Sequence, residues 1–170
     1  LDAQIWFEQK RKWYRVLEGI RRTLSIWKVG NLSVGTSDLD SIIESFDLVI
    51  VFDLGDFKRL GELGDQILKN NINIINIDHH VPRNEKYYCL SIVDIDAPAT
   101  TYMIWKYFEY LNINDAPLSD NIAIGLYAGL VNDTGSFRYS LVTSDSHNMA
   151  SHLLESNVNP NDIYREIYEN

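Results

Sequence analysis

The chain has 170 residues, the usual size of one domain with one sizeable core. Its composition of 45% hydrophobic and 23% charged residues, with 9 Gly and 4 Pro, excludes the disordered and fibrous classes. The single cysteine, Cys89, excludes a disulfide scaffold and favours a reducing compartment. The chain opens without a signal-peptide pattern and has no apolar run long enough for a bilayer, so we expect a cytoplasmic protein with no membrane partner.

The net charge of −9 is distributed unevenly along the chain. Residues 1–30 hold seven of the 15 Lys and Arg but only three of the 24 Asp and Glu, so the remaining residues carry eight basic and 21 acidic side chains. An acidic body without a basic stripe is unsuited to coating long DNA or RNA, so we expect no long nucleic acid as partner. The same surface is suited to holding divalent cations.

The first predicted element is a helix over about residues 5–27. Its apolar residues recur mostly every three, four or seven positions and include Trp6, Trp13 and Trp27, and its opposite face is basic. We expect the apolar stripe to be buried against the domain or against another chain, because an exposed stripe with three Trp favours aggregation, with a membrane-surface helix as the alternative.

Three short apolar runs predict buried strands, and each run ends in an acid. Residues 48–52 lead into Asp53, residues 72–77 into Asp78 and residues 90–95 into Asp96. A helical pattern over residues 59–70 separates the first two runs, which implies a crossover connection between parallel strands. We therefore predict an α/β fold with a largely parallel sheet flanked by helices.

The sequence pattern of the last seventy residues predicts mainly helices. Apolar spacing indicates one over residues 99–111, and hydroxyl or amide residues are expected to cap three more at Ser119, Thr143 and Asn159. The helix after Ser119 is expected to run towards residue 131, and the helix after Thr143 is expected to end near residue 155. The helix after Asn159 is expected to begin with Pro160.

Polar residues gather where the predicted strands end. Ligands of open α/β sheets bind outside the carboxyl ends of the strands, so we expect Asp53 to meet the run Asp78-His79-His80 at one edge. Asp133 follows an apolar segment and opens a turn of small residues whose amides could approach an anion. Carboxylate oxygen and imidazole nitrogen are ligands of Mn²⁺, Mg²⁺ or Zn²⁺, whereas a structural zinc site needs several cysteines.

Three ordered segments resemble motifs two, three and four of the DHH phosphoesterase family. They are Val51-Phe52-Asp53, Ile77-Asp78-His79-His80 and the eight residues from Val131 to Arg138. The similarity runs from about residue 46 to residue 170, and Tyr127-Ala128-Gly129-Leu130 resembles most closely the bacterial nanoRNases that also dephosphorylate phosphoadenosine phosphate. The resemblance implies a DHH-type N-terminal domain over residues 1–170. It also implies that two Mn²⁺ ions, or Mg²⁺ in their place, activate water to hydrolyse a short nucleotide or small phosphoester.

The resemblance further implies a role for each residue of the site. Asp53 resembles the ligand that bridges the two ions, while His79 and Asp133 resemble ligands of the second ion. His80 resembles the residue that contacts the scissile phosphate, and Asp78 resembles an acid that orients a histidine.

Two positions complete the expected site. Arg138 follows the turn of the fourth motif and is expected to meet substrate phosphate, although an Arg there is as often a surface salt-bridge residue. The first motif of the family, a His followed by Asp-x-Asp, should fall about fifty residues before Asp53, yet no His precedes His79. Asp2, 51 residues before Asp53, is then either the second Asp of that motif and a ligand of the second ion, or an ordinary acid at a helix start. The segment 38–41 mimics the motif in letters but lies too close to Asp53.

The chain therefore resembles one domain of a two-domain enzyme, without the start of the first motif and the C-terminal substrate domain. Because the ligands of the first ion are incomplete, hydrolysis by these residues alone is expected to be weak. Two alternatives stay open: a cyclic-dinucleotide phosphodiesterase or pyrophosphatase, and a degenerate, non-catalytic nucleotide-binding or regulatory domain. The oligomeric state is left open, with a homodimer as the candidate assembly.

Overall fold

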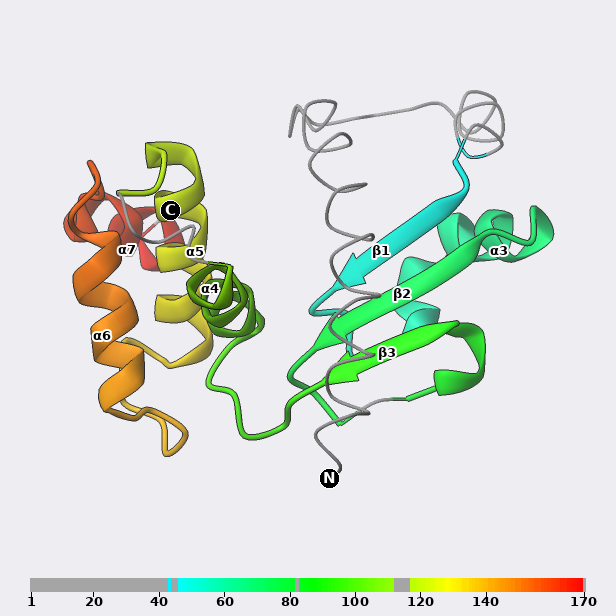
Figure 1. Ribbon diagram of the computed structural model, residues 1–170, viewed down its shortest axis with the longest axis horizontal. Helices are drawn as coiled ribbons and strands as arrows, with labels where there is room; N and C mark the ends of the chain where they lie inside the picture. The colour runs from blue at the N-terminus through cyan, green and yellow to red at the C-terminus, as the bar shows by residue number, and fades with distance from the viewer. Residues whose placement is uncertain (1–42, 44–45, 82, 112–116, 170) are drawn as a thin grey trace. The chain divides into compact units, whose positions relative to one another are not determined.

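The computed structural model describes residue 43 and residues 46–81, 83–111 and 117–169, which all belong to one compact unit, Asp40–Asn170 (Figure 1). The predicted helix over residues 5–27, the segment 38–41 and Asp2 lie outside the described residues. In the part of the chain that is described, no helix is both long and apolar enough to cross a membrane.

The sheet is parallel, as predicted. It consists of β1 (Leu48–Phe52), β2 (Asn73–Asp78) and β3 (Leu90–Val93), in the order β1-β2-β3, and the three arrows of Figure 1 point the same way. Phe52 pairs with Ile77, and Asp78 pairs with Val93. This register brings the carboxyl ends of all three strands to one edge.

Burial differs between the central and the outer strands. From Ile74 to Asp78, every residue of β2 is buried, whereas β3 is half-buried throughout. The prediction of a wholly buried strand over residues 48–52 was wrong, because Val51 is buried but Phe52 is 41% exposed. Among the described strands β1 pairs only with β2 and is therefore an outer strand of this set.

The third strand ends two residues earlier than its apolar run. The N–H of Asp94 still donates to the carbonyl of Asp78, at 3.1 Å, but the chain then turns and the N–H of Ala97 donates to Asp94. Ile95 is therefore 54% exposed, and the turn over residues 94–97 leads directly into the next helix.

The connection from β1 to β2 contains two short helices in place of the single predicted one. A 3-10 helix, η1 (Phe57–Leu60), begins at Asp56, whose carboxylate accepts the N–H of Lys58 at 3.0 Å. Gly61, with φ +53°, separates it from α3 (Glu62–Lys69). This left-handed conformation interrupts the helical pattern and is favoured at glycine. A second 3-10 helix, η2 (Glu85–Tyr87), precedes β3.

The four predicted C-terminal helices are present: α4 (Thr100–Tyr110), α5 (Asp120–Asp133), α6 (Ser144–Leu153) and α7 (Pro160–Tyr168). Thr143 caps α6 through a capping box with Ser146, and Asn159 caps α7 by accepting the N–H of Asn161 at 3.1 Å. Ser119 occupies the cap position of α5, but its side chain makes no capping bond.

Helices α4 to α7 pack on one another around an apolar core (Figure 1). Its fully buried members include Leu130, Met149 and Leu153. The approach of α5 to α4 is closest at Gly129, where an added Cβ would lie 2.4 Å from Cγ2 of Thr101. The two helices can therefore pack at this distance only because position 129 has no side chain.

Candidate metal centre

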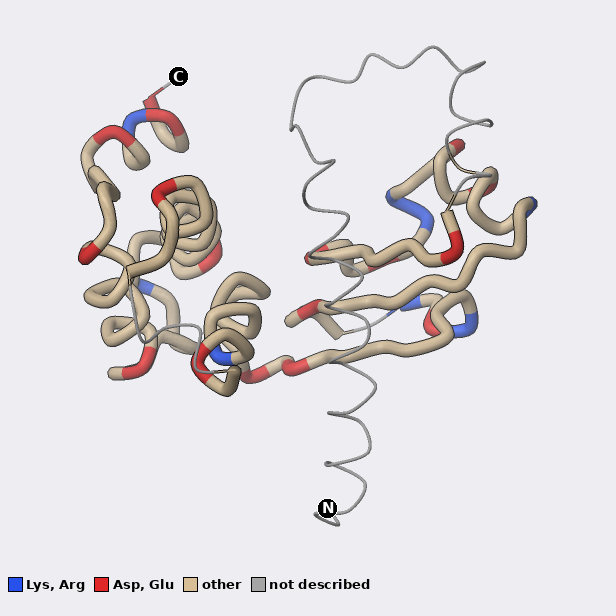
Figure 2. The backbone as a smooth tube through the Cα atoms, turned by 45° about the horizontal axis from the view of Figure 1, so that its top comes forward, with Lys and Arg blue, Asp and Glu red and all other residues tan. Residues whose placement is uncertain are grey.

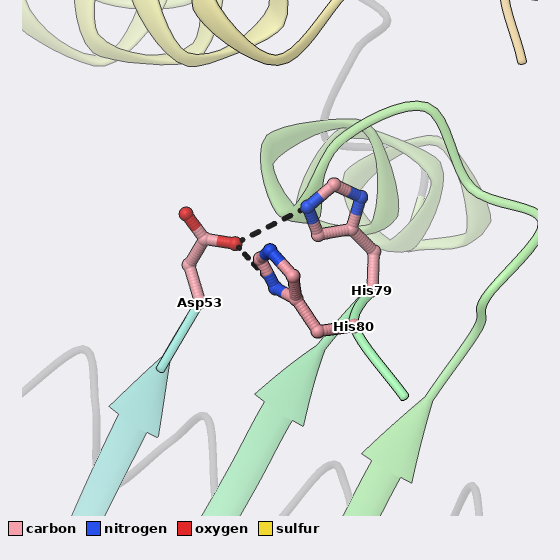
Figure 3. Close-up of side chains that lie close together, drawn as sticks. All are labelled: Asp53, His79 and His80. Atoms are coloured by element: carbon pink, nitrogen blue, oxygen red, sulfur yellow. Dashed lines mark ion pairs between the residues drawn. The ribbon is translucent and has the colours of Figure 1, made fainter. Parts of the chain in front are cut away.

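The cluster of polar side chains lies at the carboxyl edge of the sheet, where the sequence places it (Figure 3). Asp53 follows β1, and His79 and His80 follow β2. Each offers one ligand atom, and these three atoms lie within 4.8 Å of one another. Asp133 reaches the same place from α5, with its Oδ2 3.7 Å from Nε2 of His79.

Asp53 stands where β1 stops being a strand. Its N–H still donates to the carbonyl of Ile77 at 3.1 Å, but its φ is +56°, in the left-handed region that most L-residues avoid. The backbone therefore leaves the sheet at this residue. Its carboxylate projects toward the two histidines, as Figure 3 shows, and Oδ1 lies 3.4 Å from Nε2 of His79.

The ring of His79 is held by a backbone carbonyl. Its Nδ1 lies 3.2 Å from the carbonyl oxygen of Ala97, which can only accept a hydrogen bond. The proton of the neutral ring therefore belongs on Nδ1, and Nε2 presents its lone pair to Asp53 and Asp133. A carbonyl that fixes the tautomer in this way is the usual partner of a metal-binding histidine.

The ring of His80 is held instead by Asp78. Its Nδ1 lies 2.7 Å from Oδ1 of Asp78 and 3.5 Å from Oδ1 of Asp53. Asp78 also accepts the N–H of His80, at 2.9 Å, and that of Gly55, at 2.6 Å. With Nδ1 engaged by a carboxylate, the half-exposed ring of His80 has Nε2 left for another partner.

The two carboxyl groups behind and beside the histidines respond to their surroundings in opposite directions. Burial by itself would raise the pKa of Asp78, which is 1% exposed, but the hydrogen bonds from Gly55 and His80 outweigh burial and lower the pKa. Burial raises the pKa of Asp133, and a hydrogen bond from Asn132 lowers it by less. The negative charge of nearby Asp53 adds to the upward shift. Asp78 is therefore held ionised, whereas Asp133 binds a proton more readily than an ordinary Asp.

The distances from His79 to the two carboxylates fit a divalent cation. Bonds of roughly 2.0–2.3 Å meeting at about 90–109° place neighbouring ligand atoms about 2.8–3.8 Å apart. The separations from Nε2 of His79 to Asp53 and Asp133, 3.4 Å and 3.7 Å, lie within this interval. His79 therefore lies close to both carboxylates, and the sharing of one ion by Asp53, His79 and Asp133 stays a prediction.

Two details of the site differ from the sequence prediction. Asp133 is the last residue of α5 and not the start of the following turn; the turn itself runs through three left-handed residues, 135–137. Arg138 is exposed, and its Nε donates to the carbonyl of Gly135 at 2.7 Å, so this bond ties it to its own turn. Asp2 lies outside the described residues.

The sequence prediction missed Thr100. Its hydroxyl donates to Oδ1 of Asp53 at 2.9 Å, across 47 positions of the chain. A Thr at the start of a helix resembles an ordinary capping residue, so no local signal marks this contact.

A parallel sheet with Asp-His-His at the end of its central strand defines a known class of domain. The chain belongs to the DHH family, because the sequence model of the N-terminal domain of that family matches residues 6–130.

Among curated relatives, the chain is similar to the probable bifunctional oligoribonuclease and PAP phosphatase NrnA of Streptococcus mutans, with 39% identity over 108 residues. That match covers 64% of this chain and 33% of the relative. The bifunctional oligoribonuclease and PAP phosphatase NrnA of Bacillus subtilis is 29% identical over 122 residues, which cover 72% of this chain and 38% of that one. The chain thus spans about a third of the length of these relatives.

A solved structure supports the same fold. The chain resembles an exopolyphosphatase-related protein from Bacteroides fragilis with a TM-score of 0.71 and 23% identity, covering 85% of this chain and 43% of that one.

Proposed function

We propose that the chain is the catalytic domain of a manganese-dependent phosphoesterase that acts on short oligoribonucleotides or on phosphoadenosine phosphate. The observation that carries the proposal is the cluster of Asp53, His79 and His80, whose ligand atoms lie within 4.8 Å of one another, with the carboxylate of Asp133 3.7 Å from His79. The names of the Streptococcus mutans and Bacillus subtilis relatives supply the class of substrate.

The donor set favours manganese over magnesium. His79 contributes an imidazole nitrogen, whereas Mg²⁺ prefers a shell of oxygen atoms. Asp53, with a side chain 44% exposed, is accessible enough to bridge two ions. When bound, two such ions would supply a hydroxide near neutral pH and neutralise the phosphoryl oxygens.

His80 is the residue of the cluster best placed to meet substrate. The bond from its Nδ1 to Asp78 leaves Nε2 as the free atom on a half-exposed ring. A protonated His80 can donate from Nε2 to a phosphoryl oxygen whose charge grows during the reaction. Asp78 thereby orients His80 without touching substrate.

The charge of the surface favours a small substrate. Over helices α4 to α7 acidic positions outnumber basic ones (Figure 2), and the basic residues there are Lys106, Arg138 and Arg165. A long phosphate backbone would be repelled from such a surface, whereas a substrate of one or two nucleotides needs only the cluster itself.

The first test of the proposal is metal binding. Titration of the chain with Mn²⁺, followed by the electron paramagnetic resonance signal of the free ion, should show at least one bound ion. His79→Ala should abolish this binding, and His147→Ala, which removes an exposed histidine of α6 that stacks on Phe137, should leave it unchanged. A chain that binds no Mn²⁺ would be a degenerate domain, contrary to the proposal.

The second test is hydrolysis. Because the chain spans a third of the Streptococcus mutans relative, we would place it in that protein in exchange for the segment that it matches. The chimaera should release phosphate from phosphoadenosine phosphate and mononucleotides from a dinucleotide. His79→Ala should abolish this turnover, while His80→Ala should lower it and spare Mn²⁺ binding. Preferential cleavage of cyclic dinucleotides or pyrophosphate would contradict the proposed substrate.

A further inference from the structure

The turn between β3 and α4 touches the metal cluster at two points. The carbonyl of Ala97 holds Nδ1 of His79 at 3.2 Å, and the hydroxyl of Thr100 holds Oδ1 of Asp53 at 2.9 Å. Both residues are buried, with 2% and 3% exposure, whereas the side chain of Asp53 is 44% exposed. The side chains that they hold come from two other segments, the ends of β1 and β2.

We infer that Thr100 is a positioning residue, which holds the carboxylate of Asp53 in the orientation needed to bind the cation. The inference rests on the proposed function and deepens it by adding a residue to the machinery of the site. Thr100 would touch neither the ion nor the substrate and would act only through Asp53.

The oxygen that Thr100 holds is the one that faces the histidines. Oδ1 of Asp53 lies 3.4 Å from Nε2 of His79 and 3.5 Å from Nδ1 of His80. Without a donor, the half-exposed carboxylate would rotate about its last bond, since that torsion is broad in Asp. A hydrogen bond to Oδ1 therefore selects the orientation in which this atom faces Nε2 of His79.

The chemistry of a hydroxyl suits this role. A carboxylate oxygen has about two lone-pair positions, so one bond from a hydroxyl leaves a position for a cation. A Lys or Arg in the same place would hold the carboxylate equally well but would oppose the cation with its own charge. Thr100 thus orients Asp53 and leaves its negative charge available.

The geometry of α4 keeps the hydroxyl available for this contact. The cap position before Thr100 is taken by Ala99, which has an extended backbone and no polar side chain. Thr100 is the first residue of the helix, and its hydroxyl bond goes to Asp53 and not to the helix backbone. A residue that could cap the helix instead bonds to a side chain of the cluster.

The test compares the Mn²⁺ affinity of three variants with that of the unaltered chain, by the same resonance titration. Thr100→Val keeps the shape and removes the hydroxyl, so the dissociation constant should rise about 10- to 100-fold, the usual effect of losing a residue that orients a metal ligand. Thr100→Ser keeps the hydroxyl and should bind as the unaltered chain does.

Thr101→Val is the matched control. It makes the same substitution one residue along the same helix, where the buried hydroxyl has no hydrogen-bond partner among the described residues and the side chain packs on Gly129. Its affinity should not change. Should Thr100→Val fail to fold, the pair Thr100→Ser and Thr100→Ala, which differ by one oxygen atom, makes the same comparison.

The outcomes separate the inference from the proposed function. Equal affinity of Thr100→Val and the unaltered chain, or of the Ser and Ala variants, would overturn the inference and leave the metal site standing. An equal loss in Thr101→Val would overturn it as well, because the effect would then belong to α4 in general. No Mn²⁺ binding by the unaltered chain would overturn both.

Discussion

Replacing Asp78 by Asn should destabilise the fold through the loop that carries the cluster. The buried carboxylate accepts three hydrogen bonds, one from the N–H of Gly55 and two from His80. An amide of the same shape has one acceptor oxygen, so its NH₂ must face at least one of these donors. A lost bond to a charged group is worth about 1.5–3 kcal/mol, and a buried donor left without a partner adds to the loss. We expect the free energy of unfolding to fall by about 2–4 kcal/mol at pH 7.

The pH dependence makes this prediction sharper. Because the pKa of Asp78 is lowered in the folded state, its ionised form contributes fully above the ordinary pKa of an Asp, near 3.9. The contribution is lost as the pH falls through the lowered value. The Asn variant has no such group, so the difference between the two proteins should stay constant from pH 7 to about pH 5 and shrink below about pH 4.

The assay is urea denaturation followed by far-ultraviolet circular dichroism at several pH values. Asp96→Asn serves as control, since Asp96 is an exposed acid at the same edge of the sheet and should change the stability by less than about 0.5 kcal/mol. A difference below about 1 kcal/mol for Asp78→Asn at pH 7, or one that persists unchanged at pH 3, would refute the reasoning.

Three further outcomes are expected. Gly129→Ala should lower the free energy of unfolding by about 1–3 kcal/mol because the added Cβ overlaps Thr101. Gly125→Ala, in the same helix but with open space around the added Cβ, should raise the free energy of unfolding by about 0.5–1 kcal/mol. Both changes are measured by urea denaturation. Asn159→Ala removes the cap of α7 and should cost about 1 kcal/mol, seen as a lower melting temperature; an unchanged melting temperature would contradict the cap. Asp133→Asn should weaken Mn²⁺ binding at pH 7. The difference in Mn²⁺ affinity between this variant and the unaltered chain should shrink as the pH falls through the raised pKa of Asp133, because the protonated carboxyl, like the amide, carries no charge. A difference that is independent of pH would argue against this ligand.

The parallel pairing of the strands and the placement of the acids at their ends could be predicted from the sequence because both depend on local patterns. A run of apolar residues that ends in Asp53 or Asp78 marks a strand and its carboxyl end, and parallel pairing then brings the two ends together. The resemblance to the family added the pairing of these residues with Asp133, which lies more than fifty positions further along the chain.

The features that the sequence analysis did not predict depend on contacts between distant segments or on the conformation of the backbone. Thr100 meets Asp53 only because the turn after β3 ends beside β1, and no spacing of residues announces that contact. The early end of β3 follows from a turn that exposes Ile95, an apolar residue that extends the strand pattern. The roles of Arg138 and Asp2 stay predictions: the first bonds to its own turn, and the second lies outside the described residues.

The left-handed backbone at Asp53 restricts how this site can change by mutation. Asn and Gly adopt that conformation readily but lack the negative charge, while Glu keeps the charge but fits the backbone less well. Position 53 therefore requires both a residue that tolerates the left-handed backbone and a negatively charged side chain, and Asp satisfies both requirements. A lineage that abandons the chemistry can pass through Asn with its fold intact, so such a descendant would keep the sheet, the turn and the two histidines around an inert amide.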